Sequence, residues 1–414
     1  MKKQGFTTRS LKIPFPKDDP HKALQMPVYG AQAFEFETAE QIAANFRGEY
    51  IAHVYSRSSN PTVEYFELKL RELTGAHAAL AVSSGMAAIS NALFAIAKAG
   101  DNIISGNHLF GHTYALFTQT LADLGIETRF SPLHDLAEIE SRIDGKTRAI
   151  FFETVTNPQL EIADIEMLAE VANRHNLVLI ADSTLTPPNV FEARKHGVHI
   201  EVMSTTKHIS GGATSFGGAI LDCGTFNWSR NPATAPYAEK FGRNALIARL
   251  RKNIYRNTGG SMTAQTALMQ IAGLDLLELR VERCYKNCLS IGGYLHMHPE
   301  VIRVDYPGLA GTPGYEKALQ YFGGIPGTIL TFDLKSEAAC FSFMNRLKVI
   351  RRATNLNDNK TLLIHPWSTI YAEFPEEARI EMGIRTTMMR LSAGIENVDD
   401  LIEDIEGALI DFVS

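Results

Sequence analysis

The 414-residue sequence is poor in cysteine. Its four cysteines, Cys223, Cys284, Cys288 and Cys340, are too few and too scattered for a disulfide framework in a chain of this length. We therefore expect a reducing compartment, the cytoplasm. Cys284 and Cys288 lie four residues apart in a helical pattern. We interpret them as small residues on one helix face, because the matching ligands that a metal site needs are missing nearby.

The sequence also lacks a long uninterrupted apolar run and an excess of basic residues. Its most apolar segment, residues 78–100, is broken by serine, glycine, asparagine and lysine, which predicts a buried strand followed by a helix. The N-terminal segment has basic residues without the apolar core of a secretory signal. A net charge of -6, with acidic and basic residues intermixed, gives no broad basic surface. We expect neither a membrane nor a nucleic acid as a partner.

The remaining composition, 45% hydrophobic and 21% charged, is ordinary for a globular protein large enough for two domains. From residue 61 onward, helical patterns alternate with short apolar runs, which predicts an α/β fold with a mostly parallel sheet and helices on both faces. We expect an extended N-terminal arm over residues 1–60, with a short helix near 38–46. A large domain over 61–260, a connecting helix over 261–289 and a smaller α+β domain over 290–414 would follow.

Three polar residues follow predicted strands at equal spacing. Asn157, Asp182 and Lys207 are separated by steps of 25 residues, about one crossover each in a parallel sheet. We therefore expect their side chains at the carboxyl-end edge of neighbouring strands, where open α/β sheets bind ligands. Taken singly, the lysine would be a solvated loop residue and the aspartate a cap. Their joint spacing favours a ligand site.

An amine and a carboxylate that converge at a sheet edge suit pyridoxal phosphate. A lysine forms a Schiff base with the aldehyde, and an aspartate keeps the ring nitrogen protonated. In this interpretation Lys207 and Asp182 take these roles, and Asn157 contacts the ring hydroxyl. Lys207 must be neutral to act as a base, so we expect partial burial to lower its proton affinity.

The cofactor phosphate needs donors, and the segment "SSGMAA" supplies them where a strand ends and a helix begins. Gly85 and Met86 would offer backbone N–H groups at the positive end of the helix dipole. Ser204 and Thr206 would add hydroxyls from the segment of the lysine. Ordinary helix capping is the alternative interpretation of this motif.

Over nearly its whole length the sequence resembles the fold-type I, pyridoxal-phosphate-dependent enzymes of cysteine and methionine metabolism. The resemblance rests on motifs in a fixed order: "YSRSSNPT", "SSGMAAI", "LFGHTY", "ETVTNPQLEIADI", "IADSTLTPP", "STTKHISGG", "TLLIHP" and "RLSAGIE". It implies that Lys207 is the Schiff-base lysine and the catalytic acid/base. It also implies that Tyr55 and Arg57 reach the phosphate of a neighbouring subunit, and that Arg390 binds the substrate carboxylate.

Within this family, "NLNDNKTLLIHPWST", "GTFNWSRNP" and "PVYGAQAFEF" resemble the O-acetylhomoserine sulfhydrylases. This resemblance implies a transferase that exchanges the acetate of O-acetyl-L-homoserine for sulfide or another sulfur donor, forming homocysteine for methionine biosynthesis. It makes Asn355 a substrate contact. Cystathionine-forming and cystathionine-cleaving relatives usually carry Ser-Leu-Gly where this chain has Asn355, Leu356 and Asn357. Cystathionine γ-synthase and cystathionine or methionine γ-lyase remain the alternatives within the family.

The sequence departs from the family pattern at three positions. Phe110 replaces the tyrosine that stacks on the cofactor; it can stack but cannot transfer a proton. Because acetate is a stable anion that needs little acid assistance, Phe110 favours acetyl replacement over γ-lyase reactions. His112 and Tyr55 are the candidate proton donors in its place. His208 replaces an aromatic residue after the lysine, and Met86 stands where sulfhydrylases often have glutamine.

The resemblance also implies partners. Besides the amino-acid substrate, the sulfur donor would be sulfide, a thiol or a carrier protein, and the homoserine ester would be acetyl, succinyl or phospho. Active sites shared between subunits imply a homodimer, and the family assembles such dimers into tetramers. Two hypotheses from other classes remain: a pyridoxal-phosphate protein without catalysis, and a nucleotide-binding α/β protein that uses "SSGMAA" and "SGGATSFGG" as phosphate loops.

Overall fold

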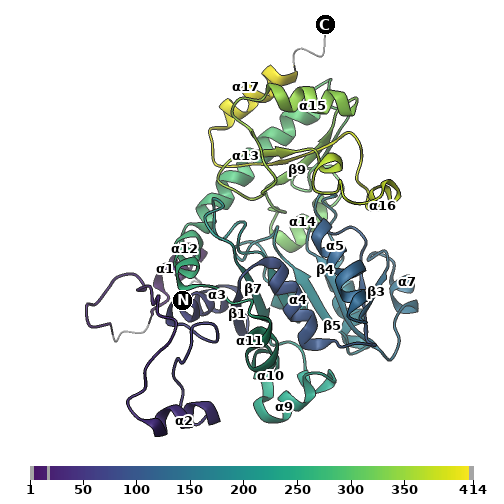
Figure 1. Cartoon of the computed structure of the whole chain (residues 1–414). Helices are drawn as coiled ribbons and strands as arrows, with labels where there is room; N and C mark the ends of the chain where they lie inside the picture. Colours follow the sequence, from purple (N-terminus) through teal and green to yellow (C-terminus); the bar gives the residue numbers. More distant parts are fainter. Residues whose placement is uncertain (1–3, 16–18, 410–414) are drawn as a thin grey trace.

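The computed structural model describes residues 4–15 and 19–409 and contains two sheets. Figure 1 shows the larger sheet in the lower body of the molecule and the smaller sheet above it, with the N-terminal segment extending to one side. Seven strands form the larger sheet in the order β1-β7-β6-β5-β4-β2-β3. Their bounds are β1 Ala78–Val82, β2 Asn102–Ser105, β3 Glu127–Phe130, β4 Thr147–Glu153, β5 Val178–Asp182, β6 Ile200–Met203 and β7 Gly218–Asp222.

The larger sheet is mostly parallel, as predicted. Strands β3, β2, β4, β5 and β6 run parallel to one another. Strand β7 is antiparallel to both β6 and β1. Strand β7 follows the turn that carries Lys207. Because it is antiparallel to β6, the chain returns beside β6 without a crossover helix.

Helices cover both faces of this sheet because alternate strand residues are apolar on both sides. Val82, Phe151 and Ile180 pack in one cluster with helix α4, whereas Phe152 and Leu179 pack in another with α8. The helices before the second sheet are α1 Phe6–Lys12, α2 Ala39–Arg47, α3 Pro61–Thr74, α4 Gly85–Ile96, α5 Gly111–Ala115, α6 Leu121–Asp123, α7 Leu136–Ser141, α8 Ile165–Arg174, α9 Ala235–Phe241, α10 Ala245–Arg249, α11 Tyr255–Thr258 and α12 Ala264–Asp275.

The smaller sheet has the order β10-β11-β12-β9-β8 and packs against helices α13, α15 and α17. Its elements are α13 Leu277–Met297, β8 Arg303–Asp305, α14 Tyr315–Phe322, β9 Ile329–Asp333, α15 Glu337–Arg346, β10 Arg351–Arg352, β11 Leu362–Ile364, α16 Glu376–Glu381, β12 Met388–Ser392 and α17 Val398–Leu409. Helix α13 continues past residue 289, where we placed the end of the connecting helix. The domain boundaries themselves stay a prediction.

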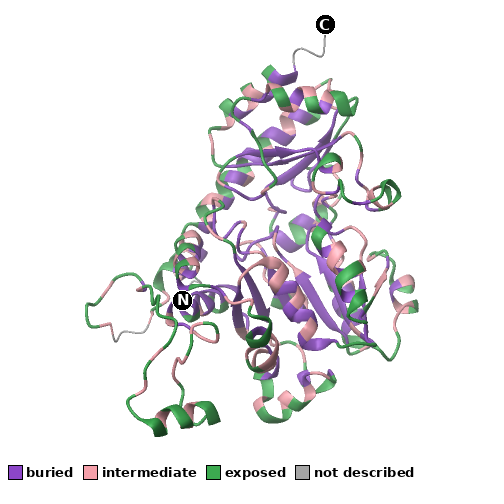
Figure 2. Cartoon of the chain, in the orientation of Figure 1, coloured by how far each residue is buried: buried purple, intermediate pink, exposed green. Residues whose placement is uncertain are grey.

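The N-terminal segment is only partly packed on the larger domain: Phe6 and Met26 are buried in one cluster with residues of β1 and β7. It contains the predicted short helix as α2 and a second helix, α1, that the sequence did not indicate. Helix α2 has no buried residue, and Figure 2 shows this part of the chain as exposed while the strands are buried. Leu24 and Ile51, both in this segment, are almost fully exposed.

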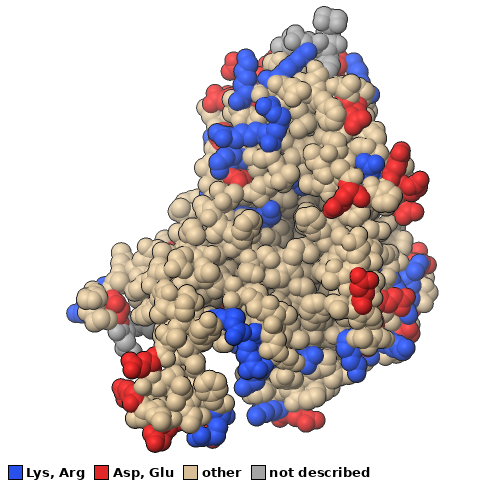
Figure 3. Space-filling view, in the orientation of Figure 1, with Lys and Arg blue, Asp and Glu red and all other residues tan. Residues whose placement is uncertain are grey.

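Charged side chains are spread unevenly over the face in Figure 3. Acidic and basic groups lie mostly toward its rim, whereas the middle of the face is largely uncharged and is hollowed between the upper and lower parts of the molecule. Among residues 4–15 and 19–409, no helix is both long and apolar enough to cross a membrane. Residues 78–100, the most apolar segment, form strand β1 and helix α4, as the sequence predicts.

Candidate active site

The structure brings most predicted site residues into one cavity of about 750 Å³, a volume typical of small-molecule sites. It lies at the carboxyl ends of β4, β5 and β6, which are neighbours in the sheet as the 25-residue spacing predicts. The predicted residues that line it are Gly85, Met86, Phe110, Asn157, Asp182, Ser204, Thr206, Lys207, Asn355 and Arg390.

Lys207 lies in a turn after β6, and its amine is mostly enclosed. The Nζ atom donates a hydrogen bond to Asn355 Oδ1 at 2.7 Å, and Asn355 Nδ2 donates in turn to Asp358 at 2.8 Å. Burial, and then the positive charge of Arg390, lower the pKa of Lys207 to about 8. The predicted decrease in proton affinity is therefore present in the protein itself.

Asp182 ends β5 beside Glu153, its register partner at the end of β4. One carboxylate oxygen of Asp182 accepts a hydrogen bond from Thr184 N at 2.9 Å. Burial raises the pKa of Asp182, and burial together with the charge of Asp182 raises that of Glu153 well above its usual value. Two neighbouring carboxyl groups at one sheet edge, Glu153 buried and Asp182 half-buried, favour a ligand that brings positive charge to them.

Arg390 on β12 is only 2% exposed, so it is not the surface salt-bridge residue that we considered as the alternative. Its guanidinium donates to Asn157 Oδ1 at 3.0 Å and to the backbone oxygens of Thr354 and Asn355. Its Nε atom is buried without a hydrogen-bond partner. No carboxylate of the described residues lies within ion-pair distance, which leaves this cation available for an anionic ligand.

The predicted phosphate site lies where β1 leads into helix α4. Ser84 caps the helix by accepting a hydrogen bond from Ala87 N, and Gly85 and Met86 occupy the first two helical positions. Backbone N–H groups at this end have no partner within the helix. A Cβ atom on Gly85 would lie 2.6 Å from the Cβ atom of Ser204, so glycine is needed for this close approach.

The two hydroxyl residues of the lysine segment differ in their surroundings. Ser204 lines the cavity and is half-buried. The Thr206 hydroxyl donates to Gly217 O at 3.1 Å and accepts from Gly217 N at 3.0 Å. Thr206 therefore already ties the lysine turn to the start of β7, and its contribution to a phosphate stays a prediction.

Phe110, at the start of helix α5 (Gly111–Ala115), lines the cavity and makes an edge contact with His112 at 5.1 Å between ring centroids. His112 also lines the cavity and is exposed, so it remains available as a proton donor. His208 does not line the cavity: it is buried, and burial followed by the charge of Arg280 lowers its pKa to about 3.

Tyr55 and Arg57 do not line this cavity. Tyr55 is 44% exposed, and Arg57 is exposed, lies over the Tyr55 ring and donates to Arg256 O. The structure of one chain thus leaves their predicted contact with a neighbouring subunit as a prediction.

Two residues that hold the backbone of this cavity, Glu153 and Tyr371, were not predicted from the sequence. Glu153 lies at the wall of the cavity and accepts hydrogen bonds from the backbone N–H groups of Phe110 and Asn157. Tyr371 is fully buried and bonds the backbone oxygens of Leu109 and Asn157. Glu153 opens the quoted motif "ETVTNPQLEIADI", but nothing in its sequence indicates the backbone groups that it holds.

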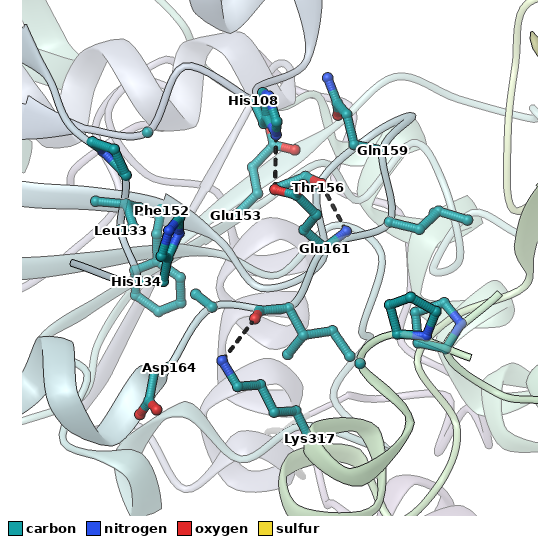
Figure 4. A pocket seen from close by; sticks show the side chains of 18 of the residues that line it. His108, Leu133, His134, Phe152, Glu153, Thr156, Gln159, Glu161, Asp164 and Lys317 are labelled. Atoms are coloured by element: carbon teal, nitrogen blue, oxygen red, sulfur yellow. Dashed lines mark hydrogen bonds and ion pairs between the residues drawn. The ribbon is translucent and has the colours of Figure 1, made fainter. Parts of the chain in front are cut away.

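A second cavity of about 550 Å³ lies on the other side of Glu153. Figure 4 shows it with the His108–Glu161 ion pair, whose atoms are 2.7 Å apart, and with the hydrogen bond from Lys317 to Ile162 O. Both acidic and basic side chains line this second cavity, so its charge favours neither anionic nor cationic ligands. Glu153 lines both cavities and forms part of the wall between them.

Comparison with known proteins identifies the family. Residues 7–410 match the family described as Cys/Met metabolism PLP-dependent enzyme. A structure from Campylobacter jejuni, described as an O-acetylhomoserine (thiol)-lyase with N'-pyridoxyl-lysine-5'-monophosphate, is 32% identical, covers 98% of this chain and 100% of its own, and superposes with a TM-score of 0.94.

Two further relatives bear on the reaction. A structure of the O-acetylhomoserine sulfhydrylase of the methionine biosynthetic pathway of Wolinella succinogenes is 42% identical, covers 86% of this chain and 99% of its own, and has a TM-score of 0.77. An L-methionine gamma-lyase from Pseudomonas putida is 33% identical and covers 98% of this chain and 97% of the lyase.

The fold and the cavity define a fold-type I, pyridoxal-phosphate-dependent enzyme with a large mostly parallel sheet and a second, smaller sheet. The chain belongs to the Cys/Met metabolism family of these enzymes. The predicted fold class and cofactor are thereby confirmed, and the hypothesis of a nucleotide-binding α/β protein is set aside.

Proposed function

We propose that this enzyme exchanges the acetate of O-acetyl-L-homoserine for sulfide or another sulfur donor, yielding homocysteine and acetate for methionine biosynthesis. The observation that carries the proposal is the convergence in one cavity of the Lys207 amine, the Asp182 carboxylate and the Arg390 guanidinium, whose Nε atom has no hydrogen-bond partner. The identity of 42% to the O-acetylhomoserine sulfhydrylase of Wolinella succinogenes supports the choice of substrate.

The residues of the cavity fit pyridoxal phosphate. The start of helix α4 offers unpaired backbone N–H groups for its phosphate, with Ser204 beside them. The half-buried carboxylate of Asp182 suits a protonated ring nitrogen, and Phe110 offers a ring face. When bound, the cofactor supplies an aldehyde for an imine with an amine and a ring that accepts electrons from the substrate α-carbon.

Lys207 would move the protons of the reaction. Its amine, held by Asn355, is deprotonated more readily than an exposed lysine and can remove a proton from the substrate α-carbon. Arg390 would orient the substrate carboxylate, and Asn355 would contact the substrate once Lys207 moves. Lys207 would next remove a proton from carbon β, so that the acetate oxygen can leave carbon γ with its bonding electrons. The sulfur nucleophile then bonds to carbon γ, and the protons return to carbons β and α.

The γ-lyase reaction is the second candidate, because the Pseudomonas putida relative is an L-methionine gamma-lyase. Phe110 favours replacement over elimination from a thioether, since a thiolate leaving group benefits from an acid that a phenyl ring cannot provide. Cystathionine γ-synthase chemistry would differ only in the sulfur nucleophile.

We also propose a homodimer whose active sites receive Tyr55 and Arg57 from the neighbouring subunit, with two such dimers forming a tetramer. The exposure of both residues outside their own cavity supports this arrangement. The sulfur donor in this proposal is sulfide, a thiol or a carrier protein. The four cysteines are all free and buried, which supports the expected location in the cytoplasm.

The test is a substrate panel with purified enzyme loaded with pyridoxal phosphate. We expect homocysteine and acetate from O-acetylhomoserine plus sulfide, faster than from the succinyl or phospho esters and faster than cleavage of methionine or cystathionine. Lys207→Ala should lose both turnover and the visible absorption of the lysine-bound cofactor. Cleavage of methionine without homocysteine formation would replace the proposal with the lyase reaction.

A further inference from the structure

Glu153 is a buried carboxyl group that bonds two separate backbone segments. It ends β4 and is 7% exposed. Its Oε1 atom accepts a hydrogen bond from Phe110 N at 2.7 Å, and its Oε2 atom accepts one from Asn157 N at 3.2 Å. Each oxygen therefore holds a segment that contributes a side chain to the cofactor cavity.

Tyr371 binds the same two segments as a hydrogen-bond donor, whereas Glu153 binds them as an acceptor. The Tyr371 side chain is fully buried, and its hydroxyl lies 3.0 Å from Leu109 O and 2.8 Å from Asn157 O. A hydroxyl has one hydrogen, so the two carbonyl groups share it. Glu153 thus accepts from the N–H groups of the segments, and Tyr371 donates to their carbonyl groups.

These four bonds fix the places of two side chains that face the cofactor. Phe110 follows Leu109, and the Asn157 side chain is held further by Arg390 at 3.0 Å. Glu153 itself lies beside Asp182 in the sheet register. A buried carboxyl group is costly unless its oxygens are hydrogen-bonded, so its retention here is explained by the two backbone donors.

We propose that Glu153 is a positioning residue of this enzyme, with Tyr371 as its partner: together they set the Phe110 ring and the Asn157 amide around the cofactor ring. The inference rests on the cofactor site of the proposed function, but not on the identity of the substrate. In this proposal Glu153, at the wall of the cavity, acts through the two backbone segments that it holds.

The first test uses the apo-protein. In Glu153→Gln the shape is kept, but an amide NH₂ group replaces one oxygen and faces a backbone N–H donor. We expect hydrogen–deuterium exchange of the amides of residues 110 and 157 to rise about tenfold, as loss of one such bond allows. Tyr371→Phe removes only the hydroxyl and should loosen the same two segments.

Matched controls separate positioning from general loss of stability. Glu201→Gln changes another buried carboxyl group of the sheet, which is 1% exposed and bonded to Ser183 Oγ at 2.6 Å. Tyr306→Phe removes another buried hydroxyl, which donates to Gly327 O at 2.9 Å. Neither residue bonds the Leu109–Phe110 or Asn157 segment, so both controls should leave exchange at residues 110 and 157 unchanged.

The second test uses the protein loaded with pyridoxal phosphate and no substrate. We expect the visible circular dichroism per bound cofactor to fall about twofold in Glu153→Gln and to change less in Tyr371→Phe. The double variant should show less than the sum of the two effects, because both residues hold the same segments.

The outcomes are distinct from those of the substrate panel. Unchanged exchange and dichroism in both Glu153→Gln and Tyr371→Phe, or equal changes in the two controls, would overturn the inference. If the variants respond as expected while the wild-type enzyme forms no homocysteine, the inference holds and the proposed substrate is wrong.

Discussion

At the scale of single residues, the environment of Lys207 determines what its amine can do. The turn after β6 encloses the side chain, and Asn355 Oδ1 accepts a hydrogen bond from the amine. The cationic Arg390 lies in the same cavity. Burial and the like charge both disfavour the protonated amine. The lysine is therefore prepared for proton transfer before any ligand contributes to its surroundings.

This environment predicts the pH dependence of the amine in the apo-enzyme. Because the pKa of Lys207 is lowered from 10.5 to about 8, its neutral form should appear as the pH rises through about 8. Acylation by an amine-selective reagent, followed peptide by peptide with mass spectrometry from pH 6 to pH 11, should show this midpoint for Lys207. Exposed lysines of the same sample should react with midpoints near 10.4. A Lys207 midpoint near those of the exposed lysines would contradict the prediction.

The sequence identified part of this site and not the rest, for a physical reason. Asn157, Asp182 and Lys207 were predictable because strand ends of a parallel sheet meet at one edge, so chain spacing reports spatial proximity. Tyr371 bonds backbone groups of two distant segments, and Glu153 bonds one at Phe110 and one at Asn157. Backbone groups are the same in every residue type and leave no side-chain pattern. Their roles depend on the folded path of the chain.

At the scale of elements, the phosphate end of the site is a close contact between a helix start and a strand end. Helix α4 begins at Gly85, directly against Ser204 after β6, and β7 begins at Gly218 beside the Ser84 carbonyl oxygen. A Cβ atom on Gly218 would lie 2.1 Å from that oxygen. The glycines at these positions let three elements meet where a phosphate would bind.

Gly85→Ala tests this contact. The added Cβ atom would lie 2.6 Å from the Ser204 Cβ atom and 3.0 Å from its Cα atom, so the start of α4 must move away from β6. We expect the dissociation constant for pyridoxal phosphate to rise about tenfold or more, measured by titrating the apo-enzyme. Gly293→Ala is the control, because nothing lies within 4 Å of a Cβ atom there. Equal affinity in the Gly85 variant would show that the close approach is not needed for binding.

The order of elements was also partly predictable. Alternating helical and apolar patterns correctly predicted the strands of the larger sheet, but not that β7 runs antiparallel between β1 and β6. Direction depends on the short turn through "GGATSFGG", which returns the chain without a crossover. In the smaller sheet, β10 has only two residues and β11 only three, and elements this short depend on their tertiary contacts more than on the local sequence.

At the scale of the whole molecule, the N-terminal segment exposes large apolar side chains that a globular protein would usually cover. Phe46 is 76% exposed and Ile51 is 97% exposed, and Tyr55 and Arg57 follow directly. Segments of this kind usually mark contacts between proteins. A second copy of this chain is the partner that also completes the proposed active site.

Mixing two inactive variants tests whether active sites are shared between subunits. If Arg57 serves the neighbouring site, a dimer of one Arg57→Ala subunit and one Lys207→Ala subunit has one site with both defects and one intact site. Random pairing should then restore about one quarter of wild-type turnover, since half of the dimers are mixed and half of their sites are intact. Two affinity tags, one on each variant, would isolate the mixed dimers and show that subunits have exchanged. Lys207→Ala mixed with Asp182→Asn is the matched control, because both residues serve the site of their own subunit and no intact site can form. Recovery in the control, or none in mixed dimers of the first pair, would contradict sharing through Arg57.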